Sequence, residues 1–412
     1  MNRKILQIII LSFLVACAPS GRKKSQPINM EKGTYGYDHA FLSENNVETI
    51  ELKSESSEAR VLIAPGYQGR VMTSSANGDI GSSFGWINYD LIESGEVNDQ
   101  FNPVGGEERF WLGPEGGPFS VYFEQGEEQV FENWNVSAVI DTEEFEIKEK
   151  EGDSVTFGKT AKLKNASGTE FDIAIERKVK LLSTDEAGRF LGTDLSGDST
   201  KVVAYQSDNI LKNTGKEAWT KESGLLSIWM LCMFNPSPSI TVFIPYNPGP
   251  KGKIVNDDYF GKVPPDRLVV DEKSATIFFK IDGAYRSKIG VPRDRASEIC
   301  GSYDSATNVL TLLWTSLPSE PKEYVNSKWG EQDDPYNGDV INSYNDGPVE
   351  DGSVMGPFYE IETSSPAADL KPGEAITHTQ RVIHIQGPEA KIAPIVSKLF
   401  GLDLNTVKTI FQ

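Results

Sequence analysis

The stretch EFDIAIERKVKLL, residues 170–182, carries the clearest structural pattern in this sequence. Its apolar residues alternate with polar ones, first at Phe171 and Ile173 and later at Val179 and Leu181. Successive side chains of a β-strand point to opposite faces, so this alternation predicts a half-buried strand. One face of that strand would cover a core and the other would meet water.

Similar short runs lie on both sides of this stretch, separated by turns rich in Gly, Asn, Asp and Pro. They predict a strand–turn–strand unit at residues 60–76 and a hairpin at 267–282. A strand apolar on both faces is predicted at 224–234, and two further strands at 308–317 and 374–386. No amphipathic helices separate them. The pattern therefore predicts an all-β domain, a sandwich or barrel rather than a parallel α/β sheet.

The C-terminus differs from this pattern. In residues 387–412, Ile392, Ile395, Val396 and Leu399 recur at helical spacing. Gly401 follows them and is placed to end the helix, and Asn405 is the expected cap of a second short helix. We expect this pair of helices to pack on the sheets as a closing segment.

The N-terminus has the features of an export signal. Basic residues precede the apolar run ILQIIILSFLVA, which is too short to span a membrane, and residues 1–16 are therefore expected to be a cleaved signal peptide. The sequence LVAC ending at Cys17 resembles the bacterial lipobox, which implies lipidation of that cysteine; an ordinary signal peptide with an incidental cysteine is the alternative. Residues 17–44 are polar and are expected to be a flexible tether.

Composition limits the function. The chain has 40 Lys+Arg and 60 Asp+Glu, a formal net charge of −20. This balance argues against binding to nucleic acid, which requires neutralisation of phosphates. With three histidines and no Cys/His spacing, no zinc site is expected, and no cofactor is predicted. Besides Cys17, Cys232 and Cys300 remain, and the sequence leaves open whether they pair.

Three stretches together resemble the galactose-mutarotase-like, or aldose 1-epimerase-like, family. They are GGEERFWLGPEGG (105–117), SDNILKNTG (207–215) followed by GLLSIWMLCMF (224–234), and FYEIETSSPAADLKPGEAITHTQRVIHI (358–385). The resemblance implies a large two-sheeted β-supersandwich over residues 45–386, as in an uncharacterised bacterial lipoprotein branch of the family.

The resemblance also implies site residues. Glu362 lies where epimerases carry their catalytic base, which takes a proton from the anomeric hydroxyl. The strand that should supply the acid histidine reads Ile228-Trp229-Met230-Leu231 and has none. The sequence therefore departs from the family pattern at the residue that would act as the acid in mutarotation. His378 and His384 share one face of the last strand, a pattern more typical of strand-surface or core histidines than of catalysts.

Five further residues are candidates for sugar binding. Arg109, Trp111 and Glu115 lie in a glycine-rich segment whose backbone can approach a ligand closely. An aromatic ring can stack on a sugar while charged groups bond its hydroxyls. Alternatively, the tryptophan is core and the charges form a structural ion pair. Asn209 and Trp229 are weaker candidates, since buried strands also use such residues for packing and turns.

Two loops carry concentrated charge. Residues 283–296 hold Arg286, Lys288, Arg293 and Arg295, which could meet an acidic sugar or simply balance charge. Residues 329–348 contain five acidic residues. Loops of this type can hold calcium, but the spacing does not match an EF-hand, so an exposed acidic loop is the favoured interpretation.

The sequence favours an exported, lipid-anchored carbohydrate-binding protein of the bacterial envelope, whose partners are a mono- or oligosaccharide and the membrane. Ala18, after the lipidated cysteine, suits the outer membrane, facing the periplasm or the outside. Two other classes remain open. One is an active sugar enzyme, an epimerase or a polysaccharide lyase, and the other is a non-catalytic envelope assembly protein.

Overall fold

A computed structural model of the chain describes residues 30–197, 199–349 and 351–412. The expected signal peptide and Cys17 lie outside these residues. Within them, no helix is both long and apolar enough to cross a membrane.

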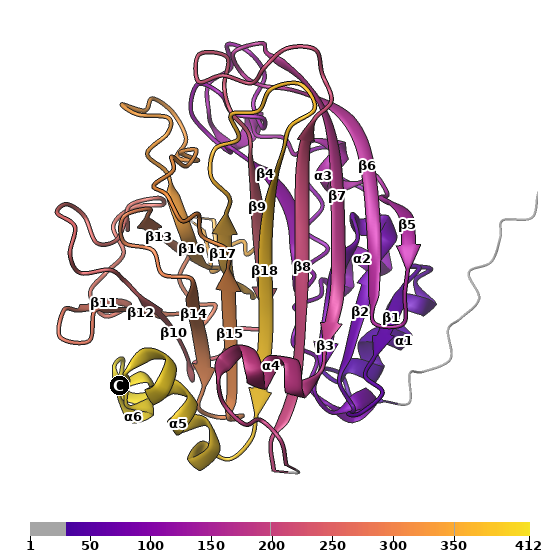
Figure 1. Ribbon diagram of the computed structural model, residues 1–412, viewed down its shortest axis with the longest axis vertical. Coiled ribbons are helices and arrows are strands. Elements are labelled where there is room, and N and C mark those ends of the chain that lie inside the picture. The colour runs from indigo at the N-terminus through magenta and orange to yellow at the C-terminus, as the bar shows by residue number, and fades with distance from the viewer. Residues whose placement is uncertain (1–29, 198, 350) are drawn as a thin grey trace, which may run out of the picture.

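The main layer is an antiparallel sheet of ten strands (Figure 1). Its long central strands carry the alternating pattern of residues 170–182, which form β7 with the predicted half-buried face. In sheet order the strands are β11 (Leu268–Asp271), β12 (Thr276–Lys280), β10 (Ile240–Pro245), β14 (Ile299–Asp304), β15 (Val309–Thr315), β18 (Ala375–Gln386), β8 (Lys201–Asn213), β7 (Glu170–Leu182), β6 (Ser154–Lys164) and β5 (Glu146–Lys150).

The second layer combines a five-stranded and a three-stranded sheet. The five strands, in order, are β13 (Ser287–Pro292), β16 (Asp339–Asn345), β17 (Tyr359–Ser364), β9 (Ser227–Phe234) and β4 (Arg109–Gly113). The three are β1 (Ile50–Lys53), β2 (Arg60–Ala64) and β3 (Arg70–Ser75). A backbone bridge between Val71 and Glu108 connects the two sheets. The predicted all-β sandwich is confirmed.

The two layers enclose the main apolar core. On β17, Tyr359 and Thr363 face the ten-stranded sheet, where they contact Ser302 of β14 and His378 of β18. Because side chains alternate along a strand, Glu360 and Glu362 of β17 point to the opposite face. Strand β9 is buried along its whole length, as its apolar sequence predicts.

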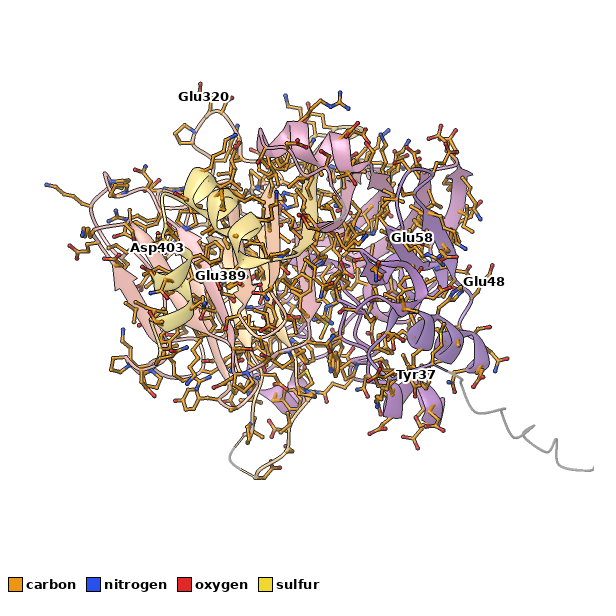
Figure 2. The ribbon with its side chains drawn as sticks, turned by 90° about the horizontal axis from the view of Figure 1, so that it is seen from below. Tyr37, Glu48, Glu58, Glu320, Glu389 and Asp403 are labelled. Atoms are coloured by element: carbon orange, nitrogen blue, oxygen red, sulfur yellow. The ribbon has the colours of Figure 1, made fainter. Side chains whose placement is uncertain are left out.

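Helices cover the outside of the sandwich. They are α1 (Tyr35–Glu44), α2 (Tyr89–Ser94), α3 (Ala138–Asp141), α4 (Thr184–Leu191), α5 (Glu389–Phe400) and α6 (Leu404–Thr409), with short 3-10 turns η1 (Pro65–Tyr67), η2 (Gly78–Ile80) and η3 (Phe131–Asn133). Seen from below, α1 and the C-terminal helices lie on opposite sides of the molecule, at Tyr37 and Asp403 (Figure 2).

The closing segment packs as predicted, with one change. Ile392, Ile395 and Val396 of α5 are buried against the outer face of the ten-stranded sheet. Gly401 ends this helix in a left-handed conformation, with φ 66°. The cap of α6 is Asp403, whose side chain accepts from the backbone N–H of Asn405, so the assignment of the cap to Asn405 is wrong.

The tether boundary at residue 44 is also wrong. Helix α1 occupies Tyr35–Glu44, and the side chain of Thr34 caps it. Tyr35, Phe41 and Leu42 are buried in a core shared with β2 and β3. The folded part therefore begins before Tyr35, and any tether is confined to the residues that precede it.

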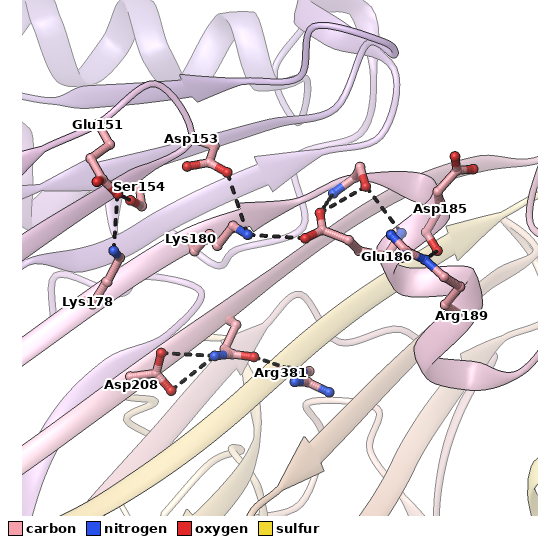
Figure 3. A network of polar contacts seen from close by, with 12 residues as sticks. Glu151, Asp153, Ser154, Lys178, Lys180, Asp185, Glu186, Arg189, Asp208 and Arg381 are labelled. Carbon is pink, nitrogen blue, oxygen red and sulfur yellow. Dashed lines mark hydrogen bonds and ion pairs between the residues drawn. The ribbon is translucent and has the colours of Figure 1, made fainter.

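The outer face of the long strands is polar. Lys180 of β7 lies between Asp153 and Glu186, at 3.7 and 3.1 Å, and Lys178 pairs with Glu151 (Figure 3). These side chains are partly exposed to solvent, so the pairs contribute little to stability. Most of the candidate site residues lie on the five-stranded sheet.

Candidate functional site

Several candidate residues converge on the face of the five-stranded sheet that points away from the ten-stranded one. Arg109 and Trp111 of β4 point to this face, and register places them beside Leu231 and Trp229 of β9. Glu362 of β17 is the next neighbour of Leu231 across the sheet. These residues, far apart in the chain, are brought together by strand order alone.

A pocket of about 90 Å³ lies on this face. This volume is several times the roughly 10–15 Å³ that a cavity needs to hold one water. Loops before and after β4, between β10 and β11, and between β15 and β17 contribute to its lining. The charged lining residues are Arg109, Glu115, Arg286, Lys288 and Glu360.

The walls of the pocket are aromatic. Trp111 and Trp229 contact edge to face across the sheet, with ring centroids 5.5 Å apart. Trp134 and Trp329 come from loops and stack with an interplanar angle of 26°. Phe101, Phe131, Phe260, Tyr344 and Phe358 complete the aromatic lining. Such a set of rings offers several flat apolar surfaces to a ligand.

Two buried ion pairs supply the polar groups. Lys288 Nζ lies 2.9 Å from Glu362 Oε2, which also accepts a hydrogen bond from Trp229 Nε1 at 2.9 Å. Arg109 Nη2 donates to Glu360 Oε1 at 3.2 Å, and its guanidinium lies 4.0 Å from the centre of the Trp111 ring. The charges thus fix the tilt of both tryptophans.

These ion pairs leave bonding capacity unused. Glu362 Oε1 and the Nε and Nη1 atoms of Arg109 are buried and have no partner among the described residues. A buried polar atom without a partner costs about 1–3 kcal/mol. Bound water or a ligand hydroxyl would satisfy these groups.

The carboxyl groups differ in their electrostatics. Burial raises the pKa of Glu360, against the opposing effect of Arg109. Burial also raises the pKa of Glu115, which Lys288 opposes and Glu362 reinforces. Burial lowers the pKa of Lys288, but Glu362 and Glu115 outweigh it, and the net shift is upward. The lysine therefore stays charged, while Glu115 and Glu360 hold protons more readily than free carboxyls.

The glycine-rich segment has a different role from the one expected. A Cβ on Gly116 would lie 2.4 Å from the carbonyl oxygen of Lys328 and close to Trp329. Glycine there lets the 328–332 loop approach β4, which places Trp329 over the pocket. Glu115 N–H also bonds Ser327 Oγ at 3.2 Å in this contact. The glycine-rich segment therefore approaches another loop of the chain, not a ligand, and it affects the pocket by placing Trp329.

Asn209 does not belong to this site, so its assignment to substrate binding is wrong. It lies between the two layers, where its Oδ1 accepts from Arg177 Nη1 at 2.7 Å and its Nδ2 donates to the carbonyl of His378. Arg177 also pairs with Glu108 at 2.6 Å, and all of these side chains are buried. Asn209 is a member of an interior polar cluster, because its strand β8 is in the opposite layer.

The two histidines of β18 are also interior. His378 Nε2 contacts Thr363 Oγ1 at 2.8 Å, and burial lowers its pKa to about 3. His384 Nε2 contacts Glu107 at 3.0 Å, and its ring stacks on Phe84. Their interpretation as core histidines is confirmed. Among the described residues, no histidine lines the pocket.

The basic residues of segment 283–296 lie in different environments. Arg286 and Lys288 reach the pocket, whereas Arg295 bonds backbone carbonyls of Asn247 and Gly252, and Arg293 lies near Asp294.

The expected acidic loop contains strand β16. Its Asp339 is buried and accepts from Asn256 Nδ2 at 2.8 Å, and burial raises its pKa to about 6. Within the described parts of the chain, no three acidic, His or Cys side chains are grouped as a metal site would need. Cys232 and Cys300 are both buried free thiols.

Sequence reasoning missed most of the pocket's walls. Trp134, Trp329 and Phe260 lie in irregular loops, and only the density of aromatics in FENW (131–134) and near 329 gave a signal. Glu360 could have been found, because it shares a strand face with Glu362 two residues away.

The sequence and the fold are similar to those of other proteins. A family model described as "Family of unknown function (DUF6786)" matches residues 33–411. No curated protein matches the sequence significantly. Among solved structures, a putative aldose 1-epimerase from Escherichia coli K12 is similar at 10% identity, covering 83% of this chain and 100% of its own, with a TM-score of 0.50.

Two further solved structures are similar. A Synechocystis protein matches at 11% identity over 83% of this chain and 97% of its own, with a TM-score of 0.50. A galactose mutarotase-like protein from Lactobacillus casei matches at 10% identity over 82% of this chain and 100% of its own, with a TM-score of 0.44. At these identities, the likeness to the two structures with TM-scores of 0.50 shows the fold alone.

Proposed function

We propose that this chain, which belongs to the DUF6786 family and has the galactose-mutarotase-like fold, binds a carbohydrate in the pocket on the outer face of its five-stranded sheet. The expected ligand is a monosaccharide or the end of an oligosaccharide. The fold is compatible with sugar handling, and the pocket's own residues carry the proposal further.

The observation that carries the proposal is the combination of aromatic walls with unsatisfied buried polar groups. Sugar rings have apolar faces and a rim of hydroxyls, and a site with flat rings and a few fixed polar atoms complements both. Trp111, Trp229 and Trp329 offer the flat rings. Arg109 supplies unpartnered donors and Glu362 an unpartnered acceptor.

The mouth of the pocket favours a ligand longer than one ring. Phe131, Phe260 and Met355 line the pocket yet remain 53%, 45% and 37% exposed. Exposed apolar side chains grouped around a pocket commonly mark a binding surface. Additional sugar units of an oligosaccharide could cover these side chains.

A second candidate function is catalysis on the bound sugar. Glu362, where the family resemblance places the base, is held by Lys288 and Trp229 and keeps one oxygen free. Glu115 lines the pocket in front of Lys288 and Glu362, and its raised pKa suits a proton donor. An epimerase would speed the polarimetric equilibration of a fresh anomer. A lyase would give a rise in ultraviolet absorbance from an unsaturated uronide.

The location of the protein is a separate proposal. Export and lipid anchoring rest on the apolar run and the LVAC sequence ending at Cys17. An outer-membrane anchor, with the folded part in the periplasm or outside, would place the pocket among envelope carbohydrates.

The test is a thermal-shift screen of the purified protein against neutral and acidic mono- and oligosaccharides, with and without Ca²⁺. A ligand that binds only the folded state raises the melting temperature by mass action. Trp329→Ala should remove the shift. Trp314→Ala is the matched control, because Trp314 is also partly buried but lies on β15 beside Phe190 and Arg381.

The screen separates the competing classes. A shift lost in Trp329→Ala and kept in Trp314→Ala supports sugar binding at this pocket. A flat screen would contradict the proposal and favour an assembly protein that keeps the fold for its surfaces.

A further inference from the structure

The three cations that line the pocket are not equivalent. Lys288 and Arg109 are each paired with a buried carboxylate, at 2.9 and 3.2 Å. Arg286 lines the same pocket but forms no ion pair with any of the described residues. In a chain with a net charge of −20, an arginine without a carboxylate partner in a pocket needs an explanation.

Arg286 is nevertheless held in place. Its guanidinium lies 4.1 Å from the centre of the Phe260 ring, and its Nε donates to the hydroxyl of Tyr344 at 3.2 Å. That hydroxyl donates in turn to Asp346 Oδ1 at 2.7 Å, so Asp346 is hydrogen-bonded to Arg286 through Tyr344 and acts on it directly only through space, without a contact close enough for an ion pair. The stacking and the hydrogen bond restrain the side chain before any ligand arrives.

The free part of Arg286 is its terminal fork. The described residues offer no hydrogen-bond partner to Nη1 and Nη2, which are the two nitrogens that bind a carboxylate end-on. A preorganised guanidinium fork binds carboxylates with two parallel charge-assisted hydrogen bonds. Because Arg286 is partly exposed, this fork is available to a ligand that occupies the pocket.

From this geometry we infer that the pocket selects an acidic sugar that bears a carboxylate, such as a hexuronic acid. Arg286 is the residue that binds this carboxylate. The inference rests on the proposed function, since it names the substrate class of the same site. Arg286 acts in binding and specificity, with the sugar ring seated between the tryptophans.

The charge of the pocket favours a carboxylate over a phosphate. Arg286 is the one lining cation, among the described residues, without an ion-pair partner, and it matches a single negative charge. A phosphate ester carries about −1.5 to −2 at pH 7. The other two lining cations, Arg109 and Lys288, are already paired with Glu360 and Glu362, so the second negative charge of a phosphate would find no counter-charge in the pocket.

The experiment compares three sugars of the same ring by titration calorimetry: galactose, galacturonate and galactose 6-phosphate, with the glucose series in parallel. The wild-type protein should bind the uronate about ten- to a hundredfold more tightly than the neutral sugar, as expected for charge-assisted hydrogen bonds. It should bind the phosphate more weakly than the uronate.

Variants assign the effect to Arg286. Arg286→Gln should bring the affinity for the uronate down to that for the neutral sugar, and Arg286→Lys should retain only part of the preference, since it keeps the charge but loses the fork. Arg293→Gln is the control, because Arg293 lies in the same segment beside Asp294 and does not line the pocket. Melting temperatures check that all variants fold.

The outcomes distinguish this inference from the proposed function. A protein that binds neutral sugars with equal or greater affinity, or that keeps its uronate preference in Arg286→Gln, overturns the inference and leaves the sugar site standing. Tighter binding of the phosphate also overturns it. A protein that binds none of these sugars overturns both.

Discussion

Glu362 is the residue on which the site depends most. Its carboxylate is fully buried, orients Trp229 through the indole N–H and neutralises Lys288. One side chain therefore sets both an aromatic wall and the charge of the pocket. The family resemblance singled out the same residue for a catalytic role, and the geometry gives it a positioning role in addition.

Replacing Glu362 by Gln should be costly. The amide keeps the shape but leaves the buried ammonium of Lys288 without its closest counter-charge, and breaking a buried pair in this way costs about 3–5 kcal/mol. Urea denaturation should show this loss in the free energy of unfolding. Glu176→Gln, at an exposed position on β7, should change it by less than about 0.5 kcal/mol. Similar values for the two variants would contradict the role assigned to Glu362.

The buried His378 makes a prediction about pH. Burial lowers its pKa to about 3, below the value of about 6.5 expected in the unfolded chain. The unfolded state therefore takes up a proton first as the pH falls, and the contribution of His378 to stability, complete above pH 6.5, decreases between pH 6.5 and 3 by up to about 1.4 kcal/mol per unit.

The comparison with His378→Gln isolates this effect. At pH 8 the wild type should be the more stable protein, because His378 bonds Thr363. The advantage should shrink as the pH falls to 5, as measured by urea denaturation at each pH. A difference that stays constant with pH would show that His378 has an ordinary pKa in the folded state.

At the scale of elements, the strands with a regular apolar pattern were predictable from sequence, whereas others such as β16 and the short irregular elements were not. The strands β2, β7, β9, β12, β15 and β18 have an alternating or largely apolar pattern that follows directly from burial. Helix α1 has no apolar stripe at helical spacing, and its segment YGYDHAFLSE therefore appeared to be part of a tether. Its burial comes from a pocket formed by β2 and β3, which no local pattern reveals.

A substitution within α1 tests whether this helix is part of the folded core. Leu42 is fully buried, so Leu42→Ala should lower the free energy of unfolding by about 2–5 kcal/mol. The neighbouring Ser43 is exposed, and Ser43→Ala should have an effect below about 0.5 kcal/mol. If Leu42→Ala were as stable as Ser43→Ala, the helix would not be part of the folded core.

At the scale of the whole molecule, the class of fold was predictable but the composition of the site only in part. Alternating strands gave a two-layered sandwich, and the family resemblance named Arg109, Trp111, Glu115, Trp229 and Glu362, all of which lie in or directly behind the pocket. Asn209 was misplaced because sequence does not tell in which layer a strand lies. The loop aromatics were missed because their positions depend on contacts such as that of Gly116 with Trp329.

The anchor is a property of the whole molecule and has its own test. If Cys17 carries lipid, Cys17→Ser should move the protein from the membrane fraction to the soluble fraction and abolish incorporation of labelled palmitate. Cys300→Ser, at a buried free thiol, is the control and should do neither. A soluble wild-type protein without label would refute the proposed anchor.

The central claim, a sugar site walled by Trp111, Trp229 and Trp329, is tested most directly by a crystal structure with the sugar that gives the largest thermal shift. The account predicts a sugar ring against these tryptophans, with hydroxyls on Arg109 and Glu362 and with a carboxylate, where present, on Arg286. Sugar density on another face of the molecule, with the pocket filled only by water, would contradict it.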